Sequence, residues 1–232
     1  MNLAGWKRAF LKTLPVMAGY LVMGGGFGIL FRVSGYGPLW ALFISIFLYA
    51  GSMQFVAISL LTGGASVLTI AVTTLLVQAR HLFYGLSLID RYKGAGIKKL
   101  YMIQAITDET YSLVCSTEPP KGIKPSSFYF AVSLLDHIYW ITGCVLGNLV
   151  GGLITFDTTG LDFVMTALFV TIFVEQWQTT KEHRPALLGA GMALVCLVLF
   201  GQDQFLIPAM IAITLSLTAL WKPLEKGVQP NG

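Results

Sequence analysis

The stretch Val67-Leu-Thr-Ile-Ala-Val-Thr-Thr-Leu-Leu-Val-Gln-Ala-Arg-His-Leu-Phe-Tyr-Gly-Leu-Ser-Leu-Ile89 decides the class of this protein. It is apolar almost throughout and long enough for a membrane helix, which takes about 20 residues to cross the hydrocarbon core. Its one formal charge is Arg80, which stands between Gln78-Ala79 and His81. An arginine at the centre of a membrane helix costs about 2.5 to 3.5 kcal/mol on insertion scales, so it predicts a functional site with a partner. The alternative is that Arg80 snorkels to an interface near a helix end.

The composition of the whole chain is typical of a membrane protein. Of its 232 residues, 55% are hydrophobic and 11% are charged, with a mean hydropathy of +0.73; an ordinary globular domain has roughly 25% charged residues. The net charge of +4 comes from basic residues in short loops, where they determine topology, so it does not indicate nucleic-acid binding. The three cysteines are widely spaced in apolar settings, which implies no disulfide framework and no metal site.

Seven ranges have the apolar length of a spanning helix, and a shorter segment lies at 100–116. We therefore predict an all-α, polytopic helical membrane protein with about seven to eight membrane segments in a single membrane domain, residues 1–232. Glycine-rich or polar residues interrupt the first three segments at mid-depth, and transporter folds build a central binding site from such broken or re-entrant helices. The seven ranges are 13–33, 38–61, 66–90, 128–153, 161–178, 186–200 and 205–221.

Loop charges predict the orientation of these segments. In the second half, the positive-inside rule places the basic connections and the C-terminus in the cytoplasm. The first half conflicts with the rule, because three crossings from a cytoplasmic start would leave the basic loop 91–99 outside. Either one early segment is re-entrant, or the rule fails there and 100–116 crosses back. The basic regions are the N-terminus, 91–99, 117–125, 179–185 and the residues after Trp221.

A faint internal repeat accompanies this pattern. Ala41–Phe47 resembles Ala167–Phe173, and at the same offset Gly25-Gly26 falls on Gly151-Gly152. The repeat would make two related halves, 13–99 and 128–221, joined by the short segment 100–116. The alternative is that apolar helices with a limited alphabet match by chance.

The short segment carries two adjacent carboxylates, Asp108 and Glu109. On one helix, Gln104 and Asp108 would share a polar face with Tyr111 and Ser112. A carboxylate in a low-dielectric environment either pairs with a cation or takes up a proton. Arg80 would then pair with one acid, and the other would carry a proton. The alternative is an amphipathic helix on the membrane surface whose acids face water.

Polar residues also recur on the longer segments. On an ideal helix Arg80 and Tyr84 share one face, with His81 to its side. Asp136, His137 and Trp140 lie on one side of the segment 128–153. The pair Asp136-His137 is either a proton relay or a charge-paired structural contact near the cytoplasmic end of its helix, and both interpretations stay open.

Motifs for enzymatic chemistry do not occur in the sequence. It has no phosphate-binding loop, no dinucleotide fingerprint, no His-Glu-x-x-His and no evident nucleophile or metal constellation. We therefore expect no enzyme activity, no cofactor and no ATP-driven transport by this chain alone.

Four features in this order and spacing resemble the AzlC family: a glycine-rich first segment, Ala50-Gly-Ser-Met-Gln-Phe55, Arg80-His-Leu-Phe-Tyr-Gly85 and Thr107-Asp-Glu109. The similarity extends from about Thr13 to Trp221, mainly in hydropathy in the second half, where Asp136-His137 maps onto no family motif. The resemblance implies efflux of valine, leucine, isoleucine and sometimes methionine across a bacterial inner membrane. It also implies a separately encoded small membrane partner, AzlD.

A branched-chain amino acid needs donors for its carboxylate, acceptors for its ammonium group and an apolar wall for its side chain. Arg80 or a helix N-terminus near Gly51–Gln54 would hold the carboxylate, Asp108 or Glu109 would face the ammonium or carry a coupling proton, and Phe27, Phe55 and Trp140 would form the wall. The alternative class is a non-transporting scaffold or assembly subunit, although a scaffold has little need of buried charge. The candidate residues for substrate binding or coupling are Gln54, Arg80, His81, Tyr84, Asp108, Glu109, Asp136, His137 and Trp140.

Overall fold

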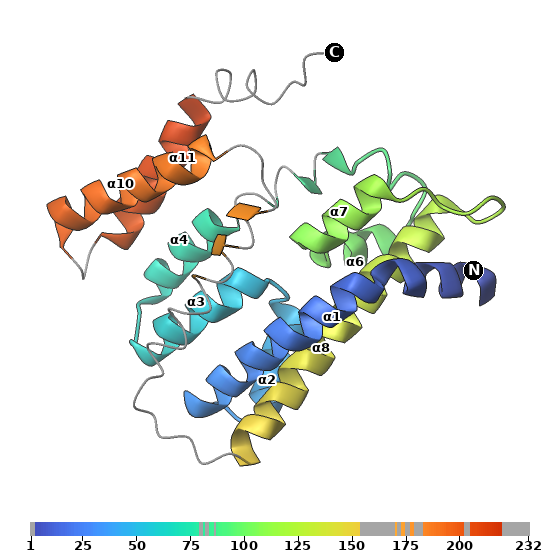
Figure 1. Cartoon of the computed structure of the whole chain (residues 1–232), viewed down its shortest axis with the longest axis horizontal. Coiled ribbons are helices and arrows are strands. Elements are labelled where there is room, and N and C mark those ends of the chain that lie inside the picture. Colours follow the sequence, from blue (N-terminus) through green and yellow to red (C-terminus); the bar gives the residue numbers. More distant parts are fainter. Residues whose placement is uncertain are drawn as a thin grey trace. The chain divides into compact units, whose positions relative to one another are not determined.

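The regular elements of the computed structural model in Figure 1 are helices, joined by turns and loops, wherever it describes the chain. Its described residues contain no strand, which confirms the all-α prediction for them. By length and composition two of the helices are able to cross a membrane, α1 (Leu3–Val33) and α8 (Pro125–Leu153). Most of the predicted segment 161–178 lies outside the described residues. Those residues are 3–78, 81, 84–85, 87–153, 170, 173–174, 177–178, 183–201 and 205–219.

The chain divides into two compact units. The first unit comprises residues 1–65 and 78–159, and the second comprises 66–77 and 160–232. In the second unit α10 (Arg184–Phe200) packs on α11 (Leu206–Ala219), and α11 packs on α4 (Val67–Val77). The two sequence halves and the internal repeat stay predictions.

Helices α1 and α8 run parallel and pack side by side in the first unit (Figure 1). Thr13, in the first half of α1, contacts Tyr139 at the middle of α8, and Gly28 contacts Asn148 closer to the C-terminal ends of both helices. A Cβ atom on Gly147 would overlap the backbone of Gly25, so glycine lets the two backbones approach closely. The expectation that glycines interrupt the first segment is therefore wrong, because α1 continues through them and uses them for packing.

The second segment is broken into α2 (Pro38–Phe47) and α3 (Gly51–Thr62). Tyr49 lies between them with a φ of 26°, a left-handed conformation that ends the helix. Helix α2 starts near the end of α8 and reaches its middle, where His137 Nε2 lies 3.2 Å from the carbonyl oxygen of Ser45. Helix α3 then packs against α1, where the rings of Phe27 and Phe55 meet edge to face. A helix of ten residues is about 15 Å long, which is half of the membrane core.

The segment at 100–116 is also broken, into α6 (Lys98–Gln104) and α7 (Asp108–Ser116). The predicted polar face from Gln104 to Asp108 is therefore wrong, because the two residues lie on different helices. Thr107 caps α7, since its Oγ1 accepts a hydrogen bond from the backbone N–H of Thr110 at 3.2 Å. Helices α6 and α7 form a hairpin whose outer ends, at Lys98 and Thr117, lie near the start of α8. The break between the two helices lies near the middle of α8, where Thr110 contacts Asp136.

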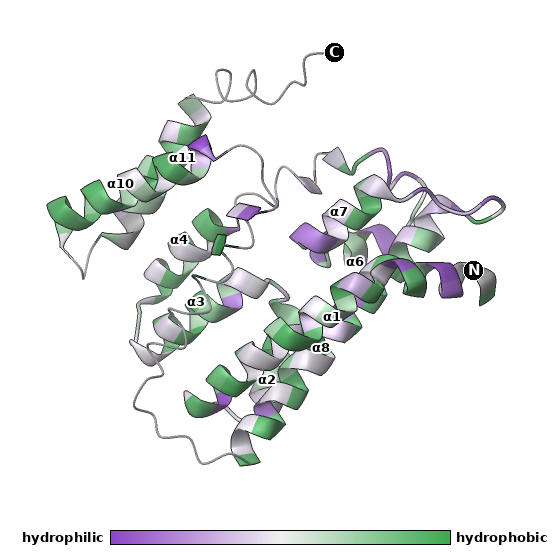
Figure 2. Ribbon diagram, viewed as in Figure 1, coloured by the Kyte–Doolittle hydropathy of each residue, from purple (hydrophilic) through white to green (hydrophobic). Residues whose placement is uncertain are grey.

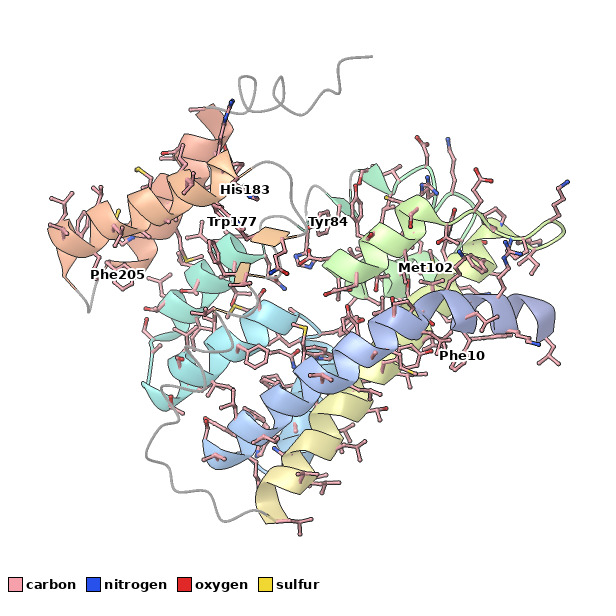
Figure 3. All side chains as sticks on the ribbon, in the orientation of Figure 1. Phe10, Tyr84, Met102, Trp177, His183 and Phe205 are labelled. Atoms are coloured by element: carbon pink, nitrogen blue, oxygen red, sulfur yellow. The ribbon has the colours of Figure 1, made fainter. Side chains whose placement is uncertain are left out.

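A buried apolar cluster holds the first unit together where α1 and α8 begin. It includes Ala9, Met102 and Phe128, and Figure 3 labels Met102 there. Arg91 joins this end, donating hydrogen bonds to the Val114 carbonyl oxygen at 2.9 Å and to the Tyr129 hydroxyl at 3.1 Å. Figure 2 shows hydrophilic residues near the N-terminus and along the connection between α7 and α8. The polar ends of several segments therefore lie together.

Candidate functional site

Both helix breaks face the middle of α8 in the first unit. From one break, the ring of Tyr49 stacks on His137 with centroids 4.2 Å apart. From the other, Thr110 donates its hydroxyl hydrogen to Asp136 Oδ2 at 2.8 Å. Asp136 is fully buried. The broken segments thus bring backbone ends and polar side chains to a depth where intact helices would present mostly apolar surface.

A continuous chain of hydrogen bonds joins Asp136 to a second acid. Thr107 donates to Thr110 at 3.0 Å and also contacts the hydroxyl of Tyr20, which lies in α1. The Tyr20 hydroxyl lies 2.7 Å from Glu109 Oε2. Because Thr107 gives its hydrogen to Thr110, the chain is continuous when Glu109 is protonated and donates to Tyr20, which then donates to Thr107. Among the residues of this hydrogen-bond chain, Glu109 is partly exposed and the others are buried. Two carboxylates are therefore connected through three hydroxyl groups.

Near these hydrogen bonds, three buried polar atoms have no hydrogen-bond partner among the described residues: Asp136 Oδ1, the Tyr49 hydroxyl and Gln54 Nε2. Leaving a buried polar atom unpaired costs about 1–3 kcal/mol, so each needs an explanation. No described cation lies within salt-bridge distance of Asp136. One acceptor and two donors are therefore left without a hydrogen bond close to the two helix breaks.

The orientation of Gln54 follows from its contact with Trp140. The indole N–H of Trp140 is a donor only, and it lies 2.7 Å from Gln54 Oε1. The amide nitrogen of Gln54 must therefore be the unpaired atom. Gly51 adjoins this contact, and a Cβ atom there would lie in ordinary van der Waals contact with the Trp140 ring, at 3.4 Å. Tyr20 packs edge-on against the same ring, with centroids 5.3 Å apart.

His137 connects three helices. Its Nε2 lies beside the Ser45 carbonyl, which only accepts, so Nε2 carries hydrogen. Its Nδ1 lies 2.9 Å from the hydroxyl of Tyr101 in α6. Gln104 likewise donates to the Ile46 carbonyl at 3.3 Å. Both ring nitrogens of His137 are occupied, which favours a structural role at the end of α2.

The motif that opened the sequence analysis is described in part. Arg80 lies outside the described residues. His81 packs edge-on against Tyr84, which is labelled in Figure 3, with centroids 5.6 Å apart. The Tyr84 hydroxyl donates to Asp108 Oδ1 at 2.7 Å. The adjacent acids therefore have different partners, Asp108 contacting Tyr84 and Glu109 contacting Tyr20.

Sequence reasoning did not single out Tyr20, Tyr49 or Thr110. The pattern Thr107-Asp-Glu is a helix-start signal, a capping residue followed by acids, and it would have predicted the second break. Tyr49 precedes the motif that begins at Ala50, but its left-handed backbone has no signature in the sequence. Among the described residues, no group of three or more His, Cys, Asp or Glu side chains is arranged to hold a metal ion.

Comparison with known proteins agrees with a membrane-embedded helical protein. The family model described as AzlC protein matches residues 15–154. The branched-chain amino acid transport protein AzlC of Bacillus subtilis is 45% identical over 96% of this chain and 88% of its own length. A membrane protein of Helicobacter pylori strain J99 is 44% identical over 96% of this chain and 98% of its own length. The inner membrane protein YgaZ of Escherichia coli is 26% identical over 90% of this chain and 89% of its own length.

No solved structure matches the chain. The relatives above span nearly its whole length, and the family model covers both helix breaks and all of α8. This result confirms the resemblance predicted from the motifs. The chain belongs to the AzlC family of membrane transport proteins.

Proposed function

We propose that this chain is a proton-coupled secondary transporter that exports valine, leucine, isoleucine and methionine across a bacterial inner membrane. The name of the Bacillus subtilis relative supports the substrate class. The observation that carries the proposal is the buried Asp136 carboxylate, which has no cationic partner among the described residues where two helix breaks meet. An amino acid supplies the missing cation.

The unpaired atoms suggest how such a substrate binds. Its ammonium group contacts Asp136 Oδ1, and its carboxylate accepts a hydrogen bond from Gln54 Nε2 near the start of α3. Its branched side chain lies against Phe27 and Phe55, whose ring centroids are 5.5 Å apart. Arg80 remains a second candidate for the carboxylate, and Asp108 remains a candidate for the coupling proton.

We further propose that both broken segments are re-entrant hairpins that enter from opposite sides of the membrane. The α2–α3 hairpin enters from the side where α1 ends, and the α6–α7 hairpin enters from the side where α1 begins. With α2–α3 re-entrant, the loop 91–99 returns to the cytoplasm and the positive-inside rule holds throughout. The C-terminus is then cytoplasmic as well.

Transport also requires a small membrane partner like AzlD, as the resemblance implies. Several large apolar side chains face outward and would contact lipid or a partner, such as Leu39, which is 81% exposed, and Val198, which is 83% exposed.

The decisive experiment is leucine efflux from proteoliposomes that contain the chain with or without the partner. We expect labelled leucine to leave faster with the partner present and with an acidic external medium, because protons entering the vesicle drive the exchange. If the assembled complex moves none of the four amino acids under either condition, the chain is a scaffold or assembly subunit instead.

A further inference from the structure

We propose that Glu109 and Asp136 share a single proton, which moves between them through the hydroxyl groups of Tyr20, Thr107 and Thr110. The path is complete in the structure. It runs from Glu109 Oε2 to the Tyr20 hydroxyl at 2.7 Å, to Thr107 Oγ1 at 2.5 Å, to Thr110 Oγ1 at 3.0 Å and to Asp136 Oδ2 at 2.8 Å. All three hydroxyl groups belong to buried residues, so water does not interrupt the path.

The transfer balances at every atom. A protonated Glu109 gives its proton to the Tyr20 oxygen as Tyr20 gives its own to Thr107. Thr107 then passes a proton to Thr110, and Thr110 passes one to Asp136 Oδ2. The moves are concerted, so each hydroxyl group ends with one proton and no alkoxide forms. The negative charge has moved from Asp136 to Glu109, and the pair keeps a charge of −1.

The surroundings favour one proton on this pair. Among the described residues no lysine or arginine neutralises Asp136, and two ionised carboxylates in a low-dielectric site repel each other. One proton on the pair removes this repulsion. The titratable side chains that face or adjoin Asp136 are Tyr20, Tyr49, Tyr101, Glu109, His137 and Tyr139.

This pair deepens the proposed function, on which its role in transport rests. The substrate ammonium needs an ionised Asp136, so the proton must then reside on Glu109, which is partly exposed and able to release it. When the proton returns to Asp136, the ammonium loses its partner and leaves. Substrate and proton therefore exclude each other at Asp136. The exit of one amino acid is coupled to the entry of one proton because Glu109, which is partly exposed, takes up a proton from the outside before the transfer and releases it to the inside after the proton has returned to it.

The transport test breaks the path and leaves both acids in place. Thr110→Val removes one hydroxyl group at nearly constant volume, and Thr110→Ser restores it. The matched control is Thr142→Val, because Thr142 is exposed on α8 and donates only to its own helix at Ile138. Tyr20→Phe breaks the path at a second point, in case Thr110→Val fails to fold.

Exchange of labelled for unlabelled leucine at equal pH is measured for every variant, and the acceleration by a proton gradient is expressed relative to that variant's own exchange rate. In Thr110→Val and Tyr20→Phe, we expect a proton gradient to accelerate efflux at least about tenfold less than in the wild type. Positioned acid–base groups contribute at least that much to a proton-transfer step. Thr110→Ser and Thr142→Val keep the acceleration. Full gradient-driven efflux in both path variants overturns the proposal.

A second readout needs no transport. Infrared difference spectra during a pH titration of the purified protein report the carbonyl band of a protonated carboxyl group. We expect a band that shifts in Asp136→Asn, Glu109→Gln and Thr110→Val but not in Asp90→Asn. If this shared band is present while leucine is not transported, the proposed function fails and the shared proton stands. If the two acids titrate independently, the shared proton is refuted whatever the transport result.

Discussion

The indole N–H of Trp140 donates a 2.7 Å hydrogen bond to Gln54 Oε1, joining the middle of α8 to the first turn of α3. This bond determines which end of the amide is left for a ligand. Without it, the amide would be free to turn its oxygen toward the substrate carboxylate, and two acceptors would then face each other. Trp140 is therefore a positioning residue for Gln54.

Replacing this tryptophan should weaken substrate binding. In Trp140→Phe the lost hydrogen bond is worth about 0.5–1.5 kcal/mol, so we expect KM for leucine to rise about two- to tenfold. Initial efflux rates at several leucine concentrations measure the effect. The matched control is Trp40→Phe, since Trp40 is 63% exposed on α2. An unchanged KM in Trp140→Phe would remove Gln54 from the carboxylate site.

The glycine contact between α1 and α8 predicts a stability effect. In Gly147→Ala the new Cβ atom meets the Gly25 backbone, which has no flexible side chain to move aside. Overpacking of this kind costs about 1–3 kcal/mol, so the thermal unfolding midpoint in detergent should fall. Gly191→Ala on α10 is the control, because a Cβ atom there meets nothing within 4 Å. Equal midpoints for the two variants would show that the helices are able to separate slightly.

The re-entrant hairpins predict a labelling pattern in a background without Cys115, Cys144 and Cys196. Cysteines introduced at Ser34 and Thr62, on either side of α2–α3, should react with an impermeant maleimide from outside the cell. A cysteine introduced at Lys93 should react only after the membrane is permeabilised. If Ser34→Cys and Thr62→Cys label from opposite sides, the segment 38–61 crosses the membrane.

The helical class was predictable because apolar length alone specifies a membrane helix, whatever its neighbours. The role of the glycines in α1 was not predictable in the same way. A glycine-rich stretch is compatible with both a break and a close helix contact, and only the facing Gly143 and Gly147 decide between them. The division of 100–116 had a local signal in Thr107-Asp-Glu, but the continuous polar periodicity across Gln104 and Asp108 masked it.

The acids of the site were visible from the sequence because a carboxylate in an apolar segment is costly. Their partners were not visible, since tyrosine and threonine are common in membrane helices and are informative only where tertiary packing brings them together. Tyr20 and Thr110 are far apart in the sequence and are brought together at the Thr107 cap. Asp136 looked like one member of an Asp-His pair, but the structure directs His137 to Tyr101 and directs Asp136 to Thr110.

The identity of the substrate acid gives the last prediction. Asp136→Asn keeps the shape of the side chain and removes its charge, so the ammonium group loses a charge-assisted hydrogen bond worth about 1.5–3 kcal/mol. We expect leucine affinity, measured by calorimetry on the purified complex, to fall about ten- to 150-fold. Asp90→Asn is the control, because Asp90 is 90% exposed and pairs with Lys93 at the surface. Glu109→Gln should bind leucine with near-normal affinity, because it leaves the Asp136 carboxylate intact. If Asp108→Asn loses binding while Asp136→Asn retains it, the ammonium group lies beside Tyr84 instead, and the centre of the site moves from α8 to the tip of α7.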